Sequence, residues 1–346
     1  QDYYDKGMRT PDDVTLLLCD DNWGNIRKLP HPGEKQRTGG YGLYYHFDYV
    51  GGPRNYKWIN TNPLPRIREQ LHLAWEYNVR QIWIVNVGDI KPMEFPISFF
   101  LDYAWNPEKI GPQDMKKYTE QWAAVQFGNK YAPEIAELLS GYAKFNSRRK
   151  PEMLSDNTDL SEKAERINQL LPAAYRDAFF QLVLHPVKAS ANLNELYYYV
   201  ARNKQAYSNK LIVANTYAGK VKELYARDSL FTLAYHQLNN GKWNYMMSQT
   251  HIGYTGWQQP NRQKMPVVNY VNANDSASIL DTVAVSRIKA KFPVNARYNL
   301  FYEQNRYISI GADHFTKAVN SNGIRWTVLP DLGRTGSAIT THPVTA

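Results

Sequence analysis

Two carboxylates, an amide and an indole directly follow the first apolar run of this sequence. Residues 14–19 are apolar apart from one threonine and end in a cysteine, and Asp20, Asp21, Asn22 and Trp23 come next. An apolar run of this length that stops in polar residues is typical of a buried parallel strand that brings side chains to the edge of a site. We therefore predict a strand over 14–19 with a polar site at its carboxyl end.

The same pattern occurs twice more along the chain. Residues 41–49 and 81–87 are predicted to be two further strands, and both stretches end in polar side chains. These side chains are His46, Asp48 and Tyr49 in the second stretch, and Asn86 and Asp89 at the end of the third. Because residues two apart in a strand face the same way, Asp20 is expected to share a face with Asn22, and His46 with Asp48.

Hydrogen-bonding groups of this kind suit a ligand that is rich in hydroxyls. Amides both donate and accept hydrogen bonds, and a neutral imidazole does the same. The neighbouring loops add groups that would pair with an anion or stack on a ring, namely Arg27, Lys28, Arg54, Lys57, Trp23 and Trp58. The set favours a polyhydroxylated ligand, with an acidic group as one option.

Each residue also has a simpler interpretation. An asparagine at a strand end often closes a turn, His46 is as readily a core histidine, and Asp20 and Asp21 suit turn chemistry. A metal site made of Asp20, His46 and Asp48 lacks the ligand spacing of known metal motifs. We predict no metal and no cofactor.

The elements that would position these residues alternate between strand and helix. Residues 65–78 have helical spacing, with Ile67, Leu71 and Trp75 on one face. Such alternation over the first 105 residues predicts βα units around a parallel sheet. No glycine-rich phosphate loop follows a strand, so we favour a (β/α)8 barrel over a doubly wound sheet.

Helical spacing then dominates the middle of the chain. Helices are expected over 114–127, 133–145, 159–200 and 205–241, with breaks or kinks at Pro172 and Pro186. An aromatic hinge follows, and strand-like runs lie at 307–310, 324–329 and 338–344. These patterns predict a multidomain α/β plus α plus β protein. Residues 1–110 form the C-terminal part of the barrel, residues 111–262 an α-helical bundle with the hinge, and residues 263–346 the start of a β-sandwich-like domain.

Composition narrows the possible partners. The net charge is +9 and the basic residues are scattered, so we predict no nucleic-acid partner. No apolar run reaches the roughly 18 residues of a membrane span, and one cysteine permits no internal disulfide. The chain starts at Gln1, close to its first strand, and we expect an internal segment of a longer polypeptide.

Five stretches carry a resemblance to a known family. They are CDDNWGN at residues 19–25, GGYGLYYHFDYVGGP at 39–53, WIVNVGD at 83–89, QTHIGY at 249–254 and LPDLGRTG at 329–336. In these long motifs the sequence resembles glycoside hydrolase family 115, the xylan α-1,2-glucuronidases, over nearly its whole length. The resemblance implies the last three units of a (β/α)8 barrel, the bundle, and the beginning of the C-terminal β domain.

The resemblance also implies an activity and a pocket. Family enzymes remove (4-O-methyl-)glucuronic acid side chains from glucuronoxylan with inversion, and Asn22, His46 and Asn86 match positions that line their pocket. On this template Asn22 and Asn86 bind the uronic acid, and His46 and Asn22 support catalysis. Weaker substrate-binding candidates are Trp23, Asp48, Tyr49 and Asp89. The family's acid and base lie on earlier strands and match no residue here, so no catalytic residue is assigned to this segment.

We therefore expect part of an α-glucuronidase that acts on glucuronoxylan or its oligosaccharides. The resemblance implies a secreted or periplasmic bacterial enzyme that is a homodimer at full length, and we expect this segment alone to be inactive. The alternative is a non-catalytic carbohydrate-binding protein for acidic plant polysaccharides. Glycan binding that depends on Asn22 and Asn86 without any hydrolysis would favour that alternative.

Overall fold

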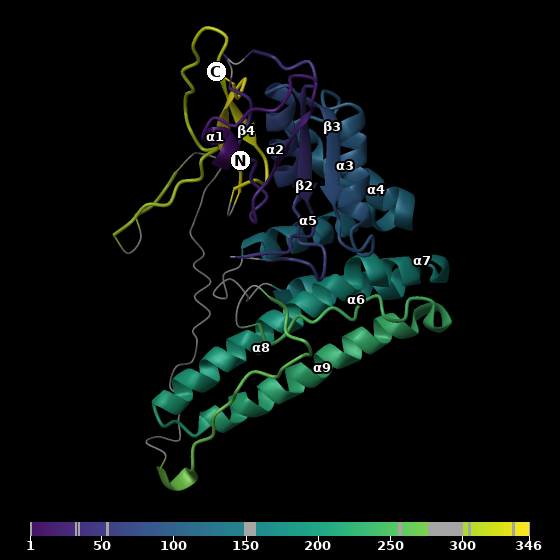
Figure 1. The fold of residues 1–346 in the computed structure, drawn as a ribbon. Helices are drawn as coiled ribbons and strands as arrows, with labels where there is room; N and C mark the ends of the chain where they lie inside the picture. Colours follow the sequence, from purple (N-terminus) through teal and green to yellow (C-terminus); the bar gives the residue numbers. More distant parts are fainter. Residues whose placement is uncertain are drawn as a thin grey trace.

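The structure is a computed structural model. It describes residues 2–31, 33, 35–52, 55–148, 157–254, 258–275, 300–303, 306–333 and 336–345. A short helix, α1 Asp2–Asp5, precedes a sheet with its covering helices, and a long pair of helices crosses beneath them (Figure 1). The predicted order of a parallel sheet followed by a helical region is confirmed.

Three parallel strands form the sheet in the order β1-β2-β3. They are β1 Leu16–Cys19, β2 Tyr41–His46 and β3 Val79–Asn86. All three strands were expected from short strand-forming runs that end in polar residues. The register pairs His46 with Asn86, so the carboxyl ends of β2 and β3 meet at one edge.

Helices cover one face of this sheet. Helix α2 Leu64–Glu76 buries Ile67, Leu71 and Ala74, which lie three, four or seven positions apart and so share one face. Helix α3 Glu94–Trp105 packs beside it through a run of aromatic residues. Periodicity does not predict α3, because its residues are apolar nearly all round.

The other face of the sheet carries exposed apolar side chains. Leu17, Ile82 and Ile84 are each more than 40% exposed. Gly42 lies between the first two, and a Cβ there would sit 2.4 Å from Cγ2 of Ile82 and 2.9 Å from Cδ1 of Leu17. Parallel sheets are normally buried on both faces, which makes this open face unusual.

Six helices make up the middle of the chain that the structure describes. They are α4 Met115–Phe127, α5 Ala132–Arg148, α6 Asn157–Leu170, α7 Ala173–Phe179, α8 His185–Ser208 and α9 Val213–Gly241. Pro172 precedes α7 and separates it from α6, as expected. The predicted break at Pro186 is wrong. A π-helical turn, Phe180–Leu184, joins α7 to α8 there, and Pro186 lies in the first turn of α8.

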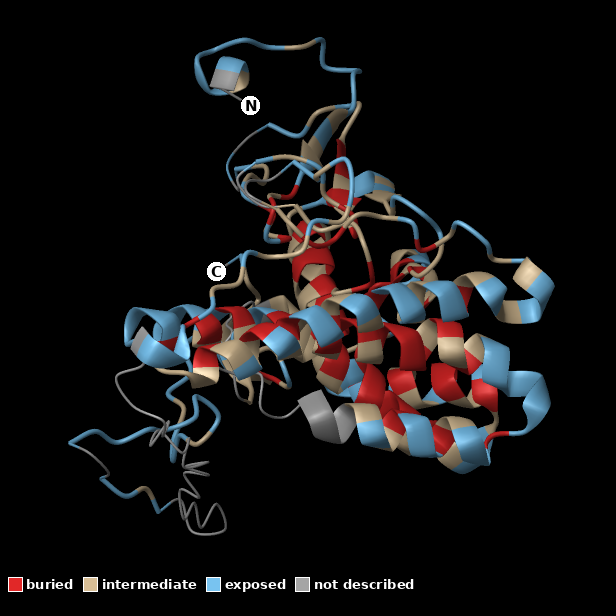
Figure 2. Ribbon diagram, turned by 90° about the horizontal axis from the view of Figure 1, so that it is seen from below, coloured by how far each residue is buried: buried red, intermediate tan, exposed pale blue. Residues whose placement is uncertain are grey.

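One buried cluster connects the sheet to the helices. It runs from Leu43 and Phe47 of the α/β part through Phe99 to Leu138 and Phe179 of the helical region. Buried residues gather where the helices face one another, and the outer faces are exposed (Figure 2). Because this core crosses residue 110, the division of the chain at that point stays a prediction.

The chain returns along α8 and α9 as an extended segment (Figure 1). We call residues 267–271 of this segment the strap. Asn203 donates from Nδ2 to the Asn269 carbonyl at 2.8 Å and accepts from the Asn269 amide at 2.9 Å. Asn215 makes the same two bonds to Val271, at 2.9 and 2.8 Å. Two side-chain amides therefore take the place of a partner strand.

A hairpin lies near the end of the chain. Strands β4 Arg325–Leu329 and β5 Ala338–His342 pair antiparallel, and Gln113 donates to the carbonyl of Val328. The strand expected at 307–310 is wrong, because residues 308–310 have no strand conformation. Whether the hairpin begins a β-sandwich stays a prediction.

Candidate functional site

A buried hydrogen bond between a carboxylate and an imidazole lies at the carboxyl edge of the sheet. Asp20 Oδ1 is 2.5 Å from Nδ1 of His46, and the His46 amide donates to Asp20 Oδ2 at 3.4 Å. The Asp20 side chain is fully buried, and that of His46 is 13% exposed. Burial raises the pKa of Asp20, and the hydrogen bonds from His46 oppose that shift. The carboxylate fixes the orientation of the imidazole and leaves Nε2 to face a ligand.

Asn86 lies beside His46 in the neighbouring strand. Its Oδ1 accepts from the Gly88 amide at 3.0 Å, so the asparagine does close a turn. Among the described residues its Nδ2 has no hydrogen-bond partner. Nδ2 of Asn86 and Nε2 of His46 are therefore left to bind a ligand at this edge, the first as a donor and the second as an acceptor when Nδ1 carries the proton.

Asn22 follows a different path from the one expected and lines the cleft of Trp23 that is described below. β1 ends at Cys19, and Asp20 forms an isolated antiparallel bridge with Ile26, so Asp20 and Asn22 do not share a strand face. Asn22 is 7% exposed, and its Nδ2 donates to the Gly51 carbonyl at 3.3 Å. That bond ties Asn22 to the loop after β2, which we call the rim loop (residues 47–63).

Aromatic rings flank the imidazole of His46. The centroids of Tyr44 and Tyr49 each lie 4.5 Å from that of the imidazole. Tyr56 in the rim loop donates its hydroxyl to the His46 carbonyl at 3.3 Å and pairs with Tyr49 through two backbone hydrogen bonds. Tyr49 was expected at the site from sequence. Tyr44 and Tyr56 were not named, although Tyr44 lies within the stretch 39–53.

Asp48 is held against the turn at Gly88. Its residue is 8% exposed, and a Cβ on Gly88 would lie 2.5 Å from Oδ2. Burial raises the pKa of Asp48 to about 6; Lys57 lowers it and the charge of Asp89 raises it. Asp48 is therefore half-protonated near pH 6 and is linked to Asp89 through their charges.

Replacing Asp48 by asparagine is expected to change how stability depends on pH. The folded-state pKa of Asp48, about 6, lies above the ordinary value of 3.8, so the wild type loses stability as pH rises through this interval. After allowance for solvent screening the loss is about 1–2 kcal/mol. Denaturant unfolding at pH 4 and pH 7 should show D48N gaining that much relative to wild type at the higher pH. An equal difference at both pH values would contradict the shift.

Two of the four loop cations predicted for the site lie away from the Asp20–His46 pair. Arg27 pairs with Asp21 at 2.5 Å, and Lys28 pairs with Asp5, both at the surface. Arg54 lies outside the described residues. Partial burial tends to raise the pKa of Asp21, but hydrogen bonds from the Asn25 and Trp23 amides and from Arg27 leave it lowered. Of the predicted cations that the structure describes, Lys57 lies close enough to lower the pKa of Asp48.

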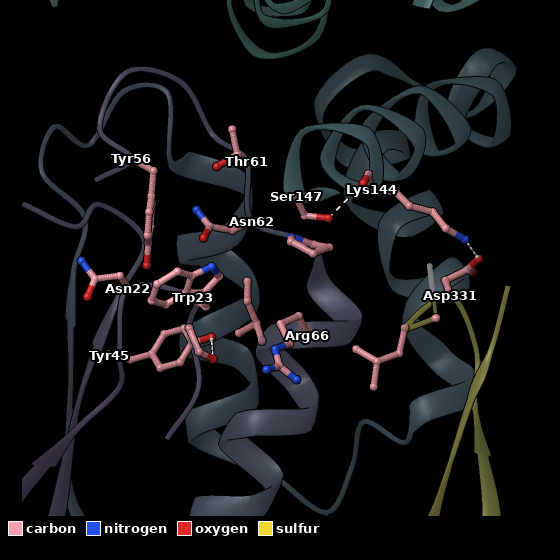
Figure 3. Close-up of a pocket in the computed structure, with 15 residues that line it drawn as sticks. Asn22, Trp23, Tyr45, Tyr56, Thr61, Asn62, Arg66, Lys144, Ser147 and Asp331 are labelled. Atoms are coloured by element: carbon pink, nitrogen blue, oxygen red, sulfur yellow. Dashed lines mark hydrogen bonds and ion pairs between the residues drawn. The ribbon is translucent and has the colours of Figure 1, made fainter. Parts of the chain in front are cut away.

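Trp23 lines a cleft between the end of the sheet and helix α2, which we call the outer cleft. The cleft measures about 370 Å³ and is not lined by His46, Asp48 or Asn86. Trp23 lies in it between Asn22 and Arg66 (Figure 3). Lys144 and Asp331 close its far side with an ion pair of 3.3 Å. Sequence spacing gives no hint of this cleft, because its walls come from distant parts of the chain.

One face of the Trp58 indole is covered. Its indole stacks on the imidazole of His251, with the centroids 3.6 Å apart and the planes inclined by 5°. His251 lies in the segment after α9, where sequence analysis predicts a hinge. The predicted stacking of Trp58 on a sugar is therefore blocked on this face.

Within the described ranges, no group of three or more His, Cys, Asp or Glu residues is arranged to hold a metal ion. The helices that the structure describes include none with the length and apolarity needed to cross a membrane.

Comparison with known proteins gives matches at both ends of the chain. Residues 1–153 match Glycosyl hydrolase family 115, and residues 300–346 match the Glycosyl hydrolase family 115 C-terminal domain. A comparison with curated proteins found no match. Among solved structures, the chain is similar to BtGH115A, a family GH115 4-O-methyl-α-glucuronidase with specificity for decorated arabinogalactans.

That structural similarity has a TM-score of 0.61 and a sequence identity of 30%, and it covers 71% of this chain. It covers 35% of the solved chain, so this sequence spans about a third of that protein's length. The two sequence matches together cover more than half of the 346 residues. The chain belongs to glycoside hydrolase family 115.

Proposed function

We propose that this chain forms one side of the uronic-acid pocket of an α-glucuronidase. One observation carries the proposal: in a member of this family, His46 is hydrogen-bonded to the buried Asp20 and is in register with Asn86 at the carboxyl edge of parallel strands. This edge is where barrel and open α/β enzymes bind their substrates. His46 and Asn86 would hold ring hydroxyls or the carboxylate of the sugar, with Asn22 beside them.

The carboxylates of this chain are poorly suited to serve as the catalytic pair. Hydrolysis with inversion needs an acid and a base about 6.5 to 9.5 Å apart, one of them able to activate water. Asp20 is bound to His46 and Asp21 to Arg27, and Asp48 is buried against Gly88. We therefore propose that these groups position the sugar and that the acid and base come from outside this chain.

The finer parts of the proposal rest on the family and on the open sheet face. The exposed residues Leu17, Ile82 and Ile84 are what further βα units of a (β/α)8 barrel would cover. We also propose cleavage of α-1,2 linkages with inversion, a secreted or periplasmic location, and a homodimer. Zonal sedimentation of the full-length protein tests the last of these.

Recognition of the sugar is tested separately from recognition of the polymer that carries it, because there are two candidate polymers. The solved relative is specific for decorated arabinogalactans, whereas the family resemblance implies glucuronoxylan. Both would offer a (4-O-methyl-)glucuronic acid side group. Release of the free acid from each polymer by the full-length protein, followed by chromatography, distinguishes them. Binding of either polymer without release would instead support the non-catalytic alternative.

Replacing Asn86 by alanine is expected to weaken binding of 4-O-methyl-glucuronic acid about tenfold, the loss of one hydrogen bond to a charged or polar group. N86A also removes the oxygen that accepts from the Gly88 amide, so the control variant must lose a turn-closing asparagine as well. Titration calorimetry gives the dissociation constant, and Asn106→Ala, which removes a turn-closing asparagine on the far side of α3, is the matched control. Unchanged binding by N86A would exclude Asn86 from the pocket.

A further inference from the structure

The segment after α9 contacts both loops that carry pocket residues. We call residues 242–263 the clasp, of which 242–254 and 258–263 are described. His251 in the clasp stacks on Trp58 of the rim loop. Trp243, also in the clasp, lies under the ammonium of Lys91, 4.5 Å from its ring centroid. Lys91 follows Asp89 by two residues, in the loop between β3 and α3.

His251 is held on every side. Its Nε2 lies 2.8 Å from Oδ1 of Asp228 on α9, and its Nδ1 lies 2.7 Å from the Gln249 carbonyl. The Asp228 carboxylate and the Gln249 carbonyl are both acceptors, so either tautomer of the ring donates to one of them. The side chains of His251 and Asp228 are 4% and 5% exposed, so the pair is buried against the indole face of Trp58.

Gln263 closes the arrangement. Its Oε1 accepts from the amides of His251 and Ile252 at 3.0 and 2.7 Å, and its Nε2 donates to Oδ2 of Asp228 at 3.3 Å. The same Nε2 is 3.1 and 3.2 Å from the two ring nitrogens of His251 and so lies over the ring. The imidazole is therefore enclosed between an indole and an amide, and Trp58 is fixed in turn.

Hydrogen bonds of the rim loop connect the segment that carries Trp58 to the pocket residues. Tyr56, two residues earlier, pairs with Tyr49 through backbone bonds of 2.8 and 3.1 Å and holds the His46 carbonyl through its hydroxyl. Asn62 donates to the Phe47 carbonyl at 3.1 Å and closes the other end of the loop. A displacement of Trp58 would therefore loosen both Tyr49 and His46.

We propose that the clasp holds the two pocket loops in their binding conformation, and that His251 is a positioning residue for the uronic acid. The inference rests on the proposed function for its ligand but not for its geometry. His251 does not touch the sugar. It acts by keeping Trp58, and through it Tyr49 and Tyr56, in place, so that ligand binding does not have to order the rim loop.

The test uses the full-length protein with His251→Gln, Trp58→Ala and Trp58→Phe. In the absence of ligand, H251Q and W58A are expected to speed amide hydrogen exchange at Tyr49 and Tyr56 about tenfold or more, since the loop opens locally. The same variants should raise the dissociation constant of 4-O-methyl-glucuronic acid about five- to tenfold. W58F keeps a flat ring on His251 and should stay within about twofold of wild type in both measurements.

His72→Gln is the control for loss of a buried histidine. His72 lies on α2, where it faces the Tyr103 hydroxyl at 3.2 Å, and it contacts neither the rim loop nor the clasp. H72Q should lower the melting temperature without changing exchange at Tyr49 or the dissociation constant. Unchanged exchange in H251Q, or equal effects of H72Q and H251Q, would overturn the inference. If the wild type fails to bind the uronic acid, the proposed function fails, and the exchange measurement still decides the role of the clasp.

Discussion

Replacing Asp20 by alanine is expected to weaken uronic acid binding about 100-fold and to lower the free energy of unfolding by about 2–3 kcal/mol. The carboxylate is fully buried and holds Nδ1 of His46 at 2.5 Å. Without it the imidazole loses both its orientation and the acceptor that fixes which nitrogen carries a proton. Calorimetric titration and denaturant unfolding of the full-length protein measure the two effects.

Asp20→Asn separates orientation from charge. Its oxygen still accepts from His46 Nδ1, so the ring stays in place while the negative charge is lost. We expect D20N to lose about tenfold in binding, intermediate between wild type and D20A. Wild-type binding by D20A would show that His46 does not contact the ligand through this arrangement. Equal losses in D20N and D20A would assign the whole effect to charge.

Replacing Gly88 by alanine is expected to cost about 3 kcal/mol of stability and to weaken ligand binding. The residue has φ of 61°, where a Cβ costs about 1 kcal/mol by itself. The new Cβ would also lie 2.5 Å from Oδ2, 2.6 Å from Cγ and 3.0 Å from Cβ of the buried Asp48, so the whole side chain would have to shift. The displaced carboxylate would disturb the turn that Asn86 closes.

Gly323→Ala is the matched control for Gly88→Ala. Gly323 has φ of 78°, and nothing lies within 4 Å of its Cβ position. G323A should therefore lose only the backbone part, about 1 kcal/mol, in the same denaturant experiment. The difference between the two variants measures the clash with Asp48. Equal losses would mean that Asp48 moves freely, contrary to its burial.

Local pattern was enough to predict the sheet and the position of two site residues. The strand-forming runs 41–49 and 81–87 predict β2 and β3, and the rule that parallel strands end at one edge brings His46 next to Asn86. That part of the site depends only on neighbours in sequence and on strand geometry.

Side-chain directions beyond the strand ends could not be predicted in the same way. After Cys19 the chain leaves the strand, because the buried Gln70 side chain accepts the Ile26 amide at 2.6 Å and fixes the path of the loop. That contact joins residues 44 positions apart. Trp23 consequently faces the outer cleft and not the His46 side of the sheet.

The contacts of the clasp could not be predicted from local sequence either. Sequence analysis predicts a hinge over its aromatic residues, because glycines and rings there have no regular spacing. In the structure His251 and Trp243 are fixed by contacts with Trp58 and Lys91, which belong to loops more than 140 residues away along the chain. Only the folded arrangement reveals that an irregular stretch has fixed partners.

The strap along α8 and α9 has a consequence for how this part of the chain can diverge between relatives. Asn203 and Asn215 recognise the backbone of Asn269 and Val271, and backbone atoms are the same whatever side chain is present. Substitutions in the strap, proline at 269 or 271 apart, should therefore be tolerated while its course is kept. No other side chain has the same length and the same donor and acceptor as the two asparagines. The course of the strap therefore depends on the residue types at 203 and 215 in the helices and not on the residue types within the strap.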